Sequence, residues 1–229
     1  MAGHSHDHPH HDHDHDDHAP ITDHDGPVSR HELLEIALRE LLVDKGVLGA
    51  ADIPAQIERT ESRTPALGAQ IVARAWTDPE FRARLTADPR ATLGGEMGLD
   101  LGHLAELAVI ENDADTHNVV VCTLCSCYPR MILGAPPSWY KSTAYRARVV
   151  RAPREVLAEF GVTLPAGTKV QVHDSTADLR FLVIPRRPDS TEGWDAEALA
   201  GLVTRDSMIG TGLPRDPADA PSGPPVPAG

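Results

Sequence analysis

Three cysteines within six positions constrain this chain more than any other feature. Residues 121–127 spell V-C-T-L-C-S-C, and Cys122, Cys125 and Cys127 are the only cysteines among 229 residues. An odd number of cysteines leaves at least one thiol outside any disulfide, and bridges between such close neighbours are strained. The spacing instead allows all three sulfurs to meet on one metal ion. The segment is therefore expected to fold as a metal-binding loop.

Size and charge limit the classes of protein to which this chain can belong. A length of 229 residues suits one sizeable domain with appendages. The net charge of −13 argues against a nucleic-acid surface, which needs basic stripes. No run approaches the roughly 18 apolar residues of a membrane span, and the N-terminus lacks the basic and apolar regions of a secretory signal. Because free thiols fit a reducing compartment, a cytoplasmic protein without membrane contact is expected.

Residues 1–28 form a separate compositional zone with nine histidines, seven aspartates and no lysine or arginine. Such a segment buries too little apolar surface to offset its chain entropy, so we expect disorder. Imidazoles alternating with carboxylates also bind divalent nickel, cobalt, zinc or copper. The zone is either a solubilising tail, an expression tag or a segment that captures a metal such as cobalt. A second disordered tail, rich in proline, is expected at 213–229.

Helical signals dominate the part of the chain before the cysteines. Ser29 and Glu32 are spaced as a capping box, the leucines after them recur at helical spacing, and Gly46 is a natural terminator. Further helices are expected at 66–76 and 79–86, the second with Asp78 as its N-cap. Gly94, Gly95 and Gly98 are expected to interrupt the helical pattern.

Short aliphatic runs at 107–110 and 118–121 predict buried strands on either side of a polar turn. The segments 169–173 and 180–184 are expected to form a strand pair joined through 174–177. Helices are expected at 143–151, 153–160 and 194–202, and a stiff loop is expected at Pro129, Gly134, Pro136 and Pro137. These elements predict an α+β fold, with a helical arm over 29–95 followed by a layered α-β-β-α metal-binding domain over 96–212.

Thiolates are soft ligands that select transition metals. A structural zinc site needs four ligands, usually in two separated pairs, and the single C-x-x-C-x-C motif has no second half. His117 and His173 are candidates for a fourth ligand, although a surface or strand-end histidine is the more ordinary interpretation of each. A thioredoxin-like redox pair would leave Cys127 unexplained.

The C-S-C portion offers a more unusual ligand set. If the sulfurs of Cys125 and Cys127 bind one ion, the backbone nitrogens of Ser126 and Cys127 also face it and, when deprotonated, close small chelate rings. Deprotonating an amide requires a strong Lewis acid such as trivalent cobalt or iron. Five donors leave one open position, which marks a catalytic rather than a structural site.

The stretch V-V-V-C-T-L-C-S-C-Y-P resembles the metal-binding motif of nitrile hydratase α subunits. The resemblance covers most of residues 30–212 and continues through L-G-A-P-P-S-W-Y-K, Y-R-A-R-V-V, P-R-E-V-L and V-T-R-D-S-M-I-G. It implies the catalytic subunit of a heteromeric hydro-lyase that converts a nitrile to an amide. The implied partner is a β-type subunit, intact or split in two, around which the helical arm wraps.

For the site, the resemblance implies that Cys122, Cys125 and Cys127 bind through sulfur and that the backbone nitrogens of Ser126 and Cys127 complete the ligand set. It also implies a sulfinate at Cys125 and a sulfenate at Cys127. Thr123 follows the first cysteine, and threonine there goes with cobalt in these families, whereas serine goes with iron. One Co3+ per chain is therefore expected, and iron is the lesser choice.

The resemblance leaves the attacking group open between hydroxide and the sulfenate oxygen of Cys127. Arginines of the partner subunit are implied to hold the oxidised sulfurs. The arginines of this chain that follow the motif, Arg146, Arg148 and Arg151, are instead expected at an interface or on a helix surface.

Two alternatives stay open. The γ subunit of thiocyanate hydrolase, which releases carbonyl sulfide and ammonia, is similar over the same span. Arg130, in place of a tryptophan common in nitrile hydratases, and the His/Asp-rich zone favour that enzyme, whereas the tract 108–118 favours nitrile hydratase. The other alternative is a non-catalytic cobalt carrier that stores the metal on its histidines and thiolates.

Overall fold

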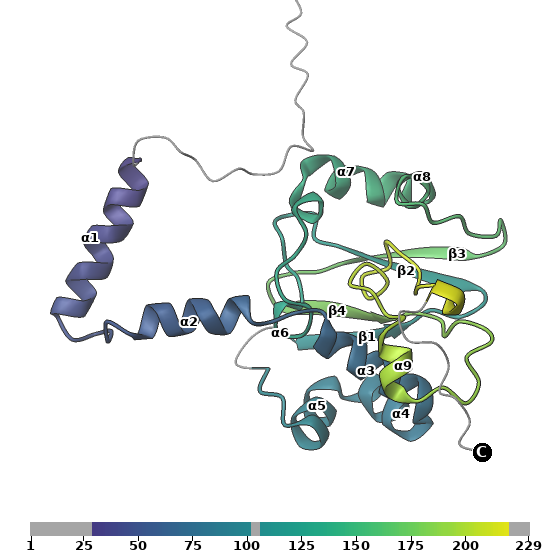
Figure 1. Ribbon diagram of the computed structural model, residues 1–229. Coiled ribbons are helices and arrows are strands. Elements are labelled where there is room, and N and C mark those ends of the chain that lie inside the picture. The colour runs from purple at the N-terminus through teal and green to yellow at the C-terminus, as the bar shows by residue number, and fades with distance from the viewer. Residues whose placement is uncertain (1–28, 102–105, 220–229) are drawn as a thin grey trace, which may run out of the picture.

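The computed structural model of the chain describes residues 29–101 and 106–219 (Figure 1). The predicted tail at 1–28 and most of the tail predicted at 213–229 lie outside these residues. Two small sheets form the middle of the molecule, with helices α7 (Thr143–Arg151) and α8 (Pro153–Glu159) on one side. Helices α3 (Ala66–Thr77), α4 (Pro79–Ala87), α5 (Pro89–Met97) and α9 (Ala196–Ala200) lie on the other. The predicted α+β fold with α-β-β-α layers is confirmed.

Each sheet in the described part consists of two parallel strands. Strand β1 (Glu106–Glu111) pairs with β4 (Leu179–Ile184), and β2 (Thr116–Val121) pairs with β3 (Lys169–Asp174). The expected pairing of β3 with β4 is therefore wrong. The turn at 175–178, closed by the Thr176 amide bonding to the Leu179 carbonyl oxygen at 2.9 Å, carries the chain from one sheet to the other. Alternation along a strand sets which face is buried, but it does not name the neighbouring strand.

A single segment of the C-terminal region joins the two sheets. The amide of Val120 in β2 donates to the Ile209 carbonyl at 2.9 Å, and the amide of Val183 in β4 donates to the Met208 carbonyl at 2.9 Å. The next residue, Gly210, has φ of +80°, and a Cβ atom there would lie 1.8 Å from the Asn118 carbonyl oxygen. Only glycine permits both this backbone conformation and this close approach.

The helix boundaries follow their capping residues. Ser29 and Glu32 form the predicted capping box at α1 (Arg30–Asp44), and Asp78 caps α4 by accepting from the Phe81 amide at 2.9 Å. Asp88 caps α5 in the same way, and this helix runs through Gly94 and Gly95 to Gly98 at its C-cap. The expected interruption at Gly94 and Gly95 is wrong, because packing and capping outweigh the low helix propensity of glycine.

The remaining elements are short or peripheral. Two helical turns, α6 (Arg130–Leu133) and η1 (Ser138–Lys141), occupy the predicted stiff loop after the cysteines. Helix α2 (Asp52–Glu61) follows α1, and η2 (Pro217–Asp219) ends the described chain. The sequence patterns predicted none of these four. None of the described helices combines the length and apolar character that crossing a bilayer requires.

The hydrophobic core contains side chains from helices α3, α4 and α5 and from both sheets. Ile71, Phe81 and Leu93 from these helices are fully buried in one cluster with Val119–Val121 of β2 and Leu182 of β4. In contrast, α1 has no buried residue, and α1 and α2 project from the body of the molecule (Figure 1). The division at residue 95 stays a prediction, and within the described residues the projecting part comprises α1 and α2.

Candidate metal centre

The three cysteines lie in an irregular loop between β2 and α6, which we call the cysteine loop (residues 122–127). Val119, Val120 and Val121 are fully buried, so the end of β2 is anchored in the core. Cys122 directly follows this strand and is buried, Cys127 is half-buried and Cys125 is exposed. The buried strand therefore delivers the first cysteine to a fixed place, and the following residues curl back toward it.

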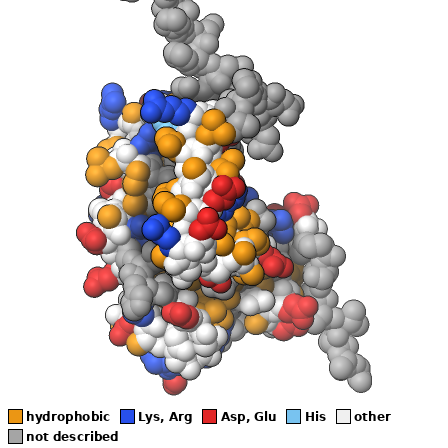
Figure 2. All heavy atoms as spheres, turned by 90° about the vertical axis from the view of Figure 1, so that its left-hand side faces the viewer, with side chains coloured by type: hydrophobic (Ala, Val, Ile, Leu, Met, Phe, Trp, Pro, Cys, Tyr) orange, Lys and Arg blue, Asp and Glu red, His pale blue; other side chains and the backbone are white. Residues whose placement is uncertain are grey.

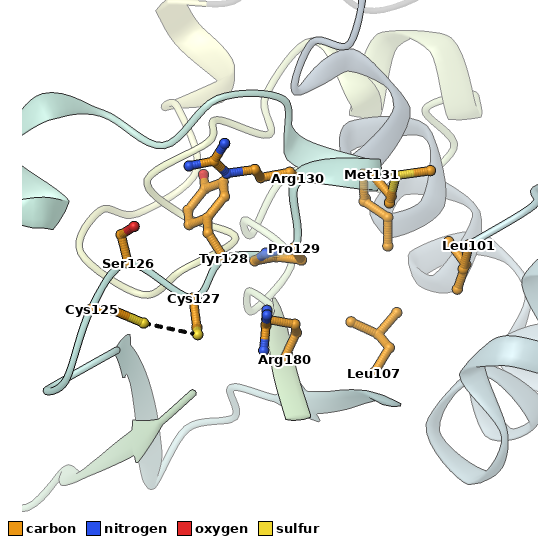
Figure 3. Close-up of a pocket in the computed structure, with 11 residues that line it drawn as sticks. Leu101, Leu107, Cys125, Ser126, Cys127, Tyr128, Pro129, Arg130, Met131 and Arg180 are labelled. Carbon is orange, nitrogen blue, oxygen red and sulfur yellow. Dashed lines mark hydrogen bonds between the residues drawn. The ribbon is translucent and has the colours of Figure 1, made fainter. Parts of the chain in front are cut away.

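The sulfur atoms converge as the spacing predicted. The Sγ atoms of Cys122 and Cys125 are 3.4 Å apart, and those of Cys125 and Cys127 are 3.2 Å apart (Figure 3). All three lie within 4.8 Å of one another, and all three thiols are free. The amide of Cys125 also points at the Cys122 sulfur, at 3.3 Å. Three soft donors this close together fit a thiophilic transition metal.

The cysteine loop has no regular secondary structure, and side chains from other elements hold it in position instead. Asp174, at the end of β3, accepts from the Thr123 amide at 2.9 Å and from the Thr123 hydroxyl at 2.5 Å. At the other end of the loop, the Tyr140 hydroxyl donates to the Cys127 carbonyl oxygen at 2.9 Å. Both ends of the loop are thus tied to the rigid part of the fold.

The thiols differ in acidity when no metal is bound. Hydrogen bonds from Cys127 and then Cys122 to its thiolate lower the pKa of Cys125 to about 7. Burial, together with donation to Cys125, raises the pKa of Cys127 to about 12, against the positive charge of Arg180. Cys125 is therefore the first sulfur of this pair to become an anionic ligand.

A pocket of about 280 Å³ opens beside the sulfurs (Figure 3). Cys125, Ser126 and Cys127 line one end, and the apolar side chains of Leu101, Leu107 and Met131 line the other. The remaining wall is formed by Tyr128, Pro129, Arg130, Ile132 and Arg180. A mostly apolar pocket of this size that ends in a cluster of donors suits a small organic molecule.

Arg180 is one of the site residues that the sequence patterns missed. It lies at the start of β4, opposite Leu107 of β1 in the sheet register, and its guanidinium group reaches toward Cys127 (Figure 3). Within the described residues it makes no ion pair, and the hydrogen bond recorded for it goes to the Leu179 carbonyl at 3.4 Å. An arginine within the otherwise apolar run L-R-F-L-V-I was the only available clue.

Neither histidine considered as a fourth ligand joins the cysteines. The group of potential metal ligands found in the described chain contains the three cysteines alone. His117 is the second residue of β2 and is buried, with its Nε2 2.7 Å from the Gly210 carbonyl oxygen, so it is a strand-end histidine rather than a surface one. His173 bonds to the Asn118 side chain at 2.8 Å. Both imidazoles belong to the strand framework rather than to the candidate metal centre.

The arginines after the motif lie mainly on α7, as expected. Arg148 forms an exposed ion pair with Glu159, with one hydrogen bond of 2.9 Å. Arg146 reaches back to the cysteine loop, where its Nη1 lies 3.4 Å from the Thr123 carbonyl oxygen. Arg151 lies beside the same loop in a shallow depression with Thr123 and Val150.

Layered helices surround parallel strand pairs, and three thiols that could hold a metal ion converge at a strand end beside a pocket. The chain belongs to the nitrile hydratase α-chain family, whose family model matches residues 29–212. A low-molecular-weight cobalt-containing nitrile hydratase α subunit from Rhodococcus rhodochrous is 50% identical, covering 80% of this chain and 89% of the relative. A thiocyanate hydrolase γ subunit from Thiobacillus thioparus is 40% identical, covering 82% of each.

Solved structures share the fold. A recombinant thiocyanate hydrolase with partially modified cobalt centres matches with a TM-score of 0.77 at 38% identity, covering 89% of this chain and 98% of that one. A variant of the Fe-type nitrile hydratase from Comamonas testosteroni Ni1 matches with a TM-score of 0.76 at 38% identity, covering 87% and 97%. The relatives thus include cobalt and iron enzymes of two activities, and the chemistry of this chain has to be argued from its own site.

Proposed function

We propose that this chain is the catalytic α subunit of a heteromeric cobalt nitrile hydratase, which hydrates a nitrile to its amide. The observation that carries the proposal is the convergence of three sulfurs, of which those of Cys125 and Cys127 belong to residues that line a mostly apolar pocket. One Co3+ ion would be held by the sulfurs of Cys122, Cys125 and Cys127 and by the backbone nitrogens of Ser126 and Cys127. Cys125 as a sulfinate and Cys127 as a sulfenate would complete the mature site.

The donor set fits this ion. Three thiolates with two amide nitrogens favour a small trivalent metal, whereas four-ligand zinc has no fourth donor in the described residues. When bound, such an ion supplies Lewis acidity, which polarises the carbon–nitrogen triple bond or acidifies water. Cobalt-containing α subunits from Rhodococcus rhodochrous and Pseudonocardia thermophila, the latter 47% identical, support cobalt over iron.

The pocket residues perform the remaining tasks. Leu101, Leu107 and Met131 hold the apolar substituent of the substrate and exclude water around it. The opposite end of the pocket places the triple-bonded carbon near Cys127. There the guanidinium group of Arg180 favours negative charge, both on the sulfur group and on the substrate nitrogen as hydration proceeds.

The projecting helices provide the surface for the partner subunit. Leu33, Leu34, Leu38 and Leu41 of α1 are each about half exposed, and Ile57 of α2 is exposed as well. A groove of about 650 Å³ lies between the two helices, lined by Val43, Ile53 and Pro54 among others. Figure 2, viewed from this side, shows hydrophobic side chains on the same face. Because a soluble chain rarely leaves such a surface bare, a β-type subunit is proposed to cover it.

A second candidate function is favoured by Arg130. Its side chain lines the pocket, so two guanidinium groups, those of Arg130 and Arg180, border the space where substrate would lie. Thiocyanate is a small anion with a carbon–nitrogen triple bond, and positive side chains would attract it. The thiocyanate hydrolase γ subunit among the relatives supports this alternative.

The decisive experiment assays the purified complex of this chain with its partner on acrylonitrile and on thiocyanate. Amide formation supports nitrile hydratase, and carbonyl sulfide with ammonia supports the alternative. Tightly held cobalt near one per chain, with three added oxygens on the peptide containing residues 122–127, supports either enzyme. Cobalt that a chelator removes readily, with neither activity, identifies the carrier and contradicts both.

Cysteine variants test the ligand set. Replacing Cys122, Cys125 or Cys127 by serine is expected to abolish tight cobalt binding and lower activity by roughly 100-fold or more. Ser126→Ala is the matched control, because it removes a side chain but keeps the backbone nitrogen, and it is expected to retain cobalt. Full turnover in any cysteine variant would contradict the proposal.

A further inference from the structure

Tyr140 is a buried residue whose single polar atom ends on the cysteine loop. Its side chain is fully buried and packs against Tyr128, with ring centroids 5.1 Å apart, and against Tyr145 at 5.8 Å. From this aromatic cluster the hydroxyl group donates to the Cys127 carbonyl oxygen at 2.9 Å. A rigid ring therefore reaches out of the core and fixes one main-chain atom beside the candidate metal centre.

That atom belongs to a cysteine outside the regular secondary structure. Cys122 is held by the end of β2, and Thr123 is held by Asp174. Cys127 lies in neither helix nor strand, and it contributes both a sulfur and a backbone nitrogen to the proposed ligand set. The carbonyl carbon and the Cβ of Cys127 are bonded to the same Cα, so holding the carbonyl group restrains the Cα from which the sulfur-bearing side chain extends. Fixing the carbonyl group therefore limits how far the Cys127 sulfur can move.

We propose that Tyr140 is a positioning residue for Cys127. The consequence of this role for catalysis rests on the proposed function. The Tyr140 hydroxyl group fixes the main chain so that the Cys127 sulfur and nitrogen face the metal and the pocket. The residue acts only through the backbone and touches neither metal nor substrate.

The chain offers a matched control in Tyr145. Its side chain is also buried, and its hydroxyl group donates to the Val120 carbonyl oxygen at 2.7 Å, but this acceptor lies within β2 rather than in the cysteine loop. Tyr140→Phe and Tyr145→Phe each delete one buried hydroxyl with a main-chain acceptor and leave the aromatic packing intact. A purely structural role predicts the same result for both variants.

The experiment compares the two variants with the unaltered chain, each assembled with its partner and loaded with cobalt. Tyr140→Phe is expected to shift the sulfur-to-cobalt absorption band, to release cobalt to a chelator several times faster, and to lower kcat about tenfold with KM nearly unchanged, the size of one lost hydrogen bond. Tyr145→Phe is expected to lower the melting temperature to a similar degree while the band, the cobalt retention and kcat stay close to those of the unaltered chain. Equal effects of the two variants on band and retention, or no effect of Tyr140→Phe, would overturn the proposal.

Failure of the proposed function is distinguishable from failure of this inference. If the unaltered complex hydrates neither substrate, the absorption band and the cobalt retention still report the geometry of Cys127. If it binds no cobalt at all, the readout becomes the rate at which iodoacetamide alkylates Cys127, measured by peptide mass. Tyr140→Phe then raises this rate relative to Tyr145→Phe if the inference holds, and equal rates refute it.

Discussion

Three polar side chains and one main-chain carbonyl group near the ends of the strands determine one another's orientation. The Asn112 Oδ1 accepts from both the amide and the Nδ2 of Asn118, so its Nδ2 must face the Nδ1 of His117, 3.3 Å away. The Gly210 carbonyl oxygen can only accept, so the His117 Nε2 carries the proton. The His117 Nδ1 is then an acceptor, and the ring is neutral. A proton on Nδ1 would face the Asn112 amide donor.

This network predicts a loss of stability in mild acid. Burial lowers the pKa of His117, and of His173 beside it, below the usual value near 6.5. As the pH falls, the unfolded chain therefore binds protons before the folded chain does. The contribution of these histidines to the free energy of unfolding is fully present above about pH 6.5 and is lost as the pH drops from there toward the folded-state pKa. Urea unfolding between pH 5 and 8 measures this slope. His117→Gln is expected to flatten it, whereas the exposed control His31→Gln is not, and equal slopes would contradict the assignment.

The carboxylate of Asp174 restrains the start of the cysteine loop. Asp174→Asn replaces one of its two acceptors for Thr123 by a donor, so we expect a loss of about 1 kcal/mol in unfolding free energy and faster cobalt release to a chelator. Asp178→Asn, an exposed aspartate in the following turn, is the control. Cobalt retention that is the same in both variants would show that Asp174 does not hold the loop.

At the scale of elements, local capping was predictable and long-range partners were not. The capping box at Ser29 and the Asp-Pro signal at Asp78 fixed two helix starts, because both depend on residues within one turn. The helix that begins after Asp88 was not predicted, and the folded helix tolerates the cost of Gly94 and Gly95. The parallel partners of β3 and β4 could not be predicted, because their hydrogen bonds join residues more than 50 positions apart.

Helix α1 carries a prediction of its own. Leu34→Gln combined with Leu38→Gln removes two exposed apolar side chains and is expected to weaken association with the β-type partner by roughly tenfold or more. Because no residue of α1 is buried, the melting temperature of the isolated chain is expected to stay unchanged. Glu35→Gln, which introduces the same side chain elsewhere on the helix, is the control. Analytical ultracentrifugation measures the affinity, and unaltered binding would exclude α1 from the interface.

For the whole molecule, charge and composition separate the N-terminal zone from the rest. Residues 1–28 supply seven of the thirteen net negative charges, and they hold nine of the thirteen histidines. A ligand-rich segment tethered to the chain raises the local concentration of divalent cobalt available to the cysteine loop. This zone is therefore proposed to capture cobalt before the mature site forms.

Removal of residues 2–28 tests this proposal at the level of the whole chain. Cobalt occupancy is expected to fall several-fold when cobalt is limiting during expression, and to match that of the full chain when cobalt is in excess. A full-length variant with all nine histidines of the zone replaced by asparagine separates loss of imidazole from loss of length. Metal analysis of the purified complexes gives the occupancy, and equal values under limiting cobalt would leave the zone as a solubilising tail.

The sequence by itself determined that the three cysteines come together, the layered fold class and most helices, because cysteine spacing, caps and hydrophobic periodicity act within a few residues. Only the tertiary structure decided what surrounds the cysteines. Arg180, Asp174 and Tyr140 reach Cys122–Cys127 from two different strands and a helical turn. Their approach depends on which strands pair and how the layers stack, and burial of apolar surface from the whole chain sets both.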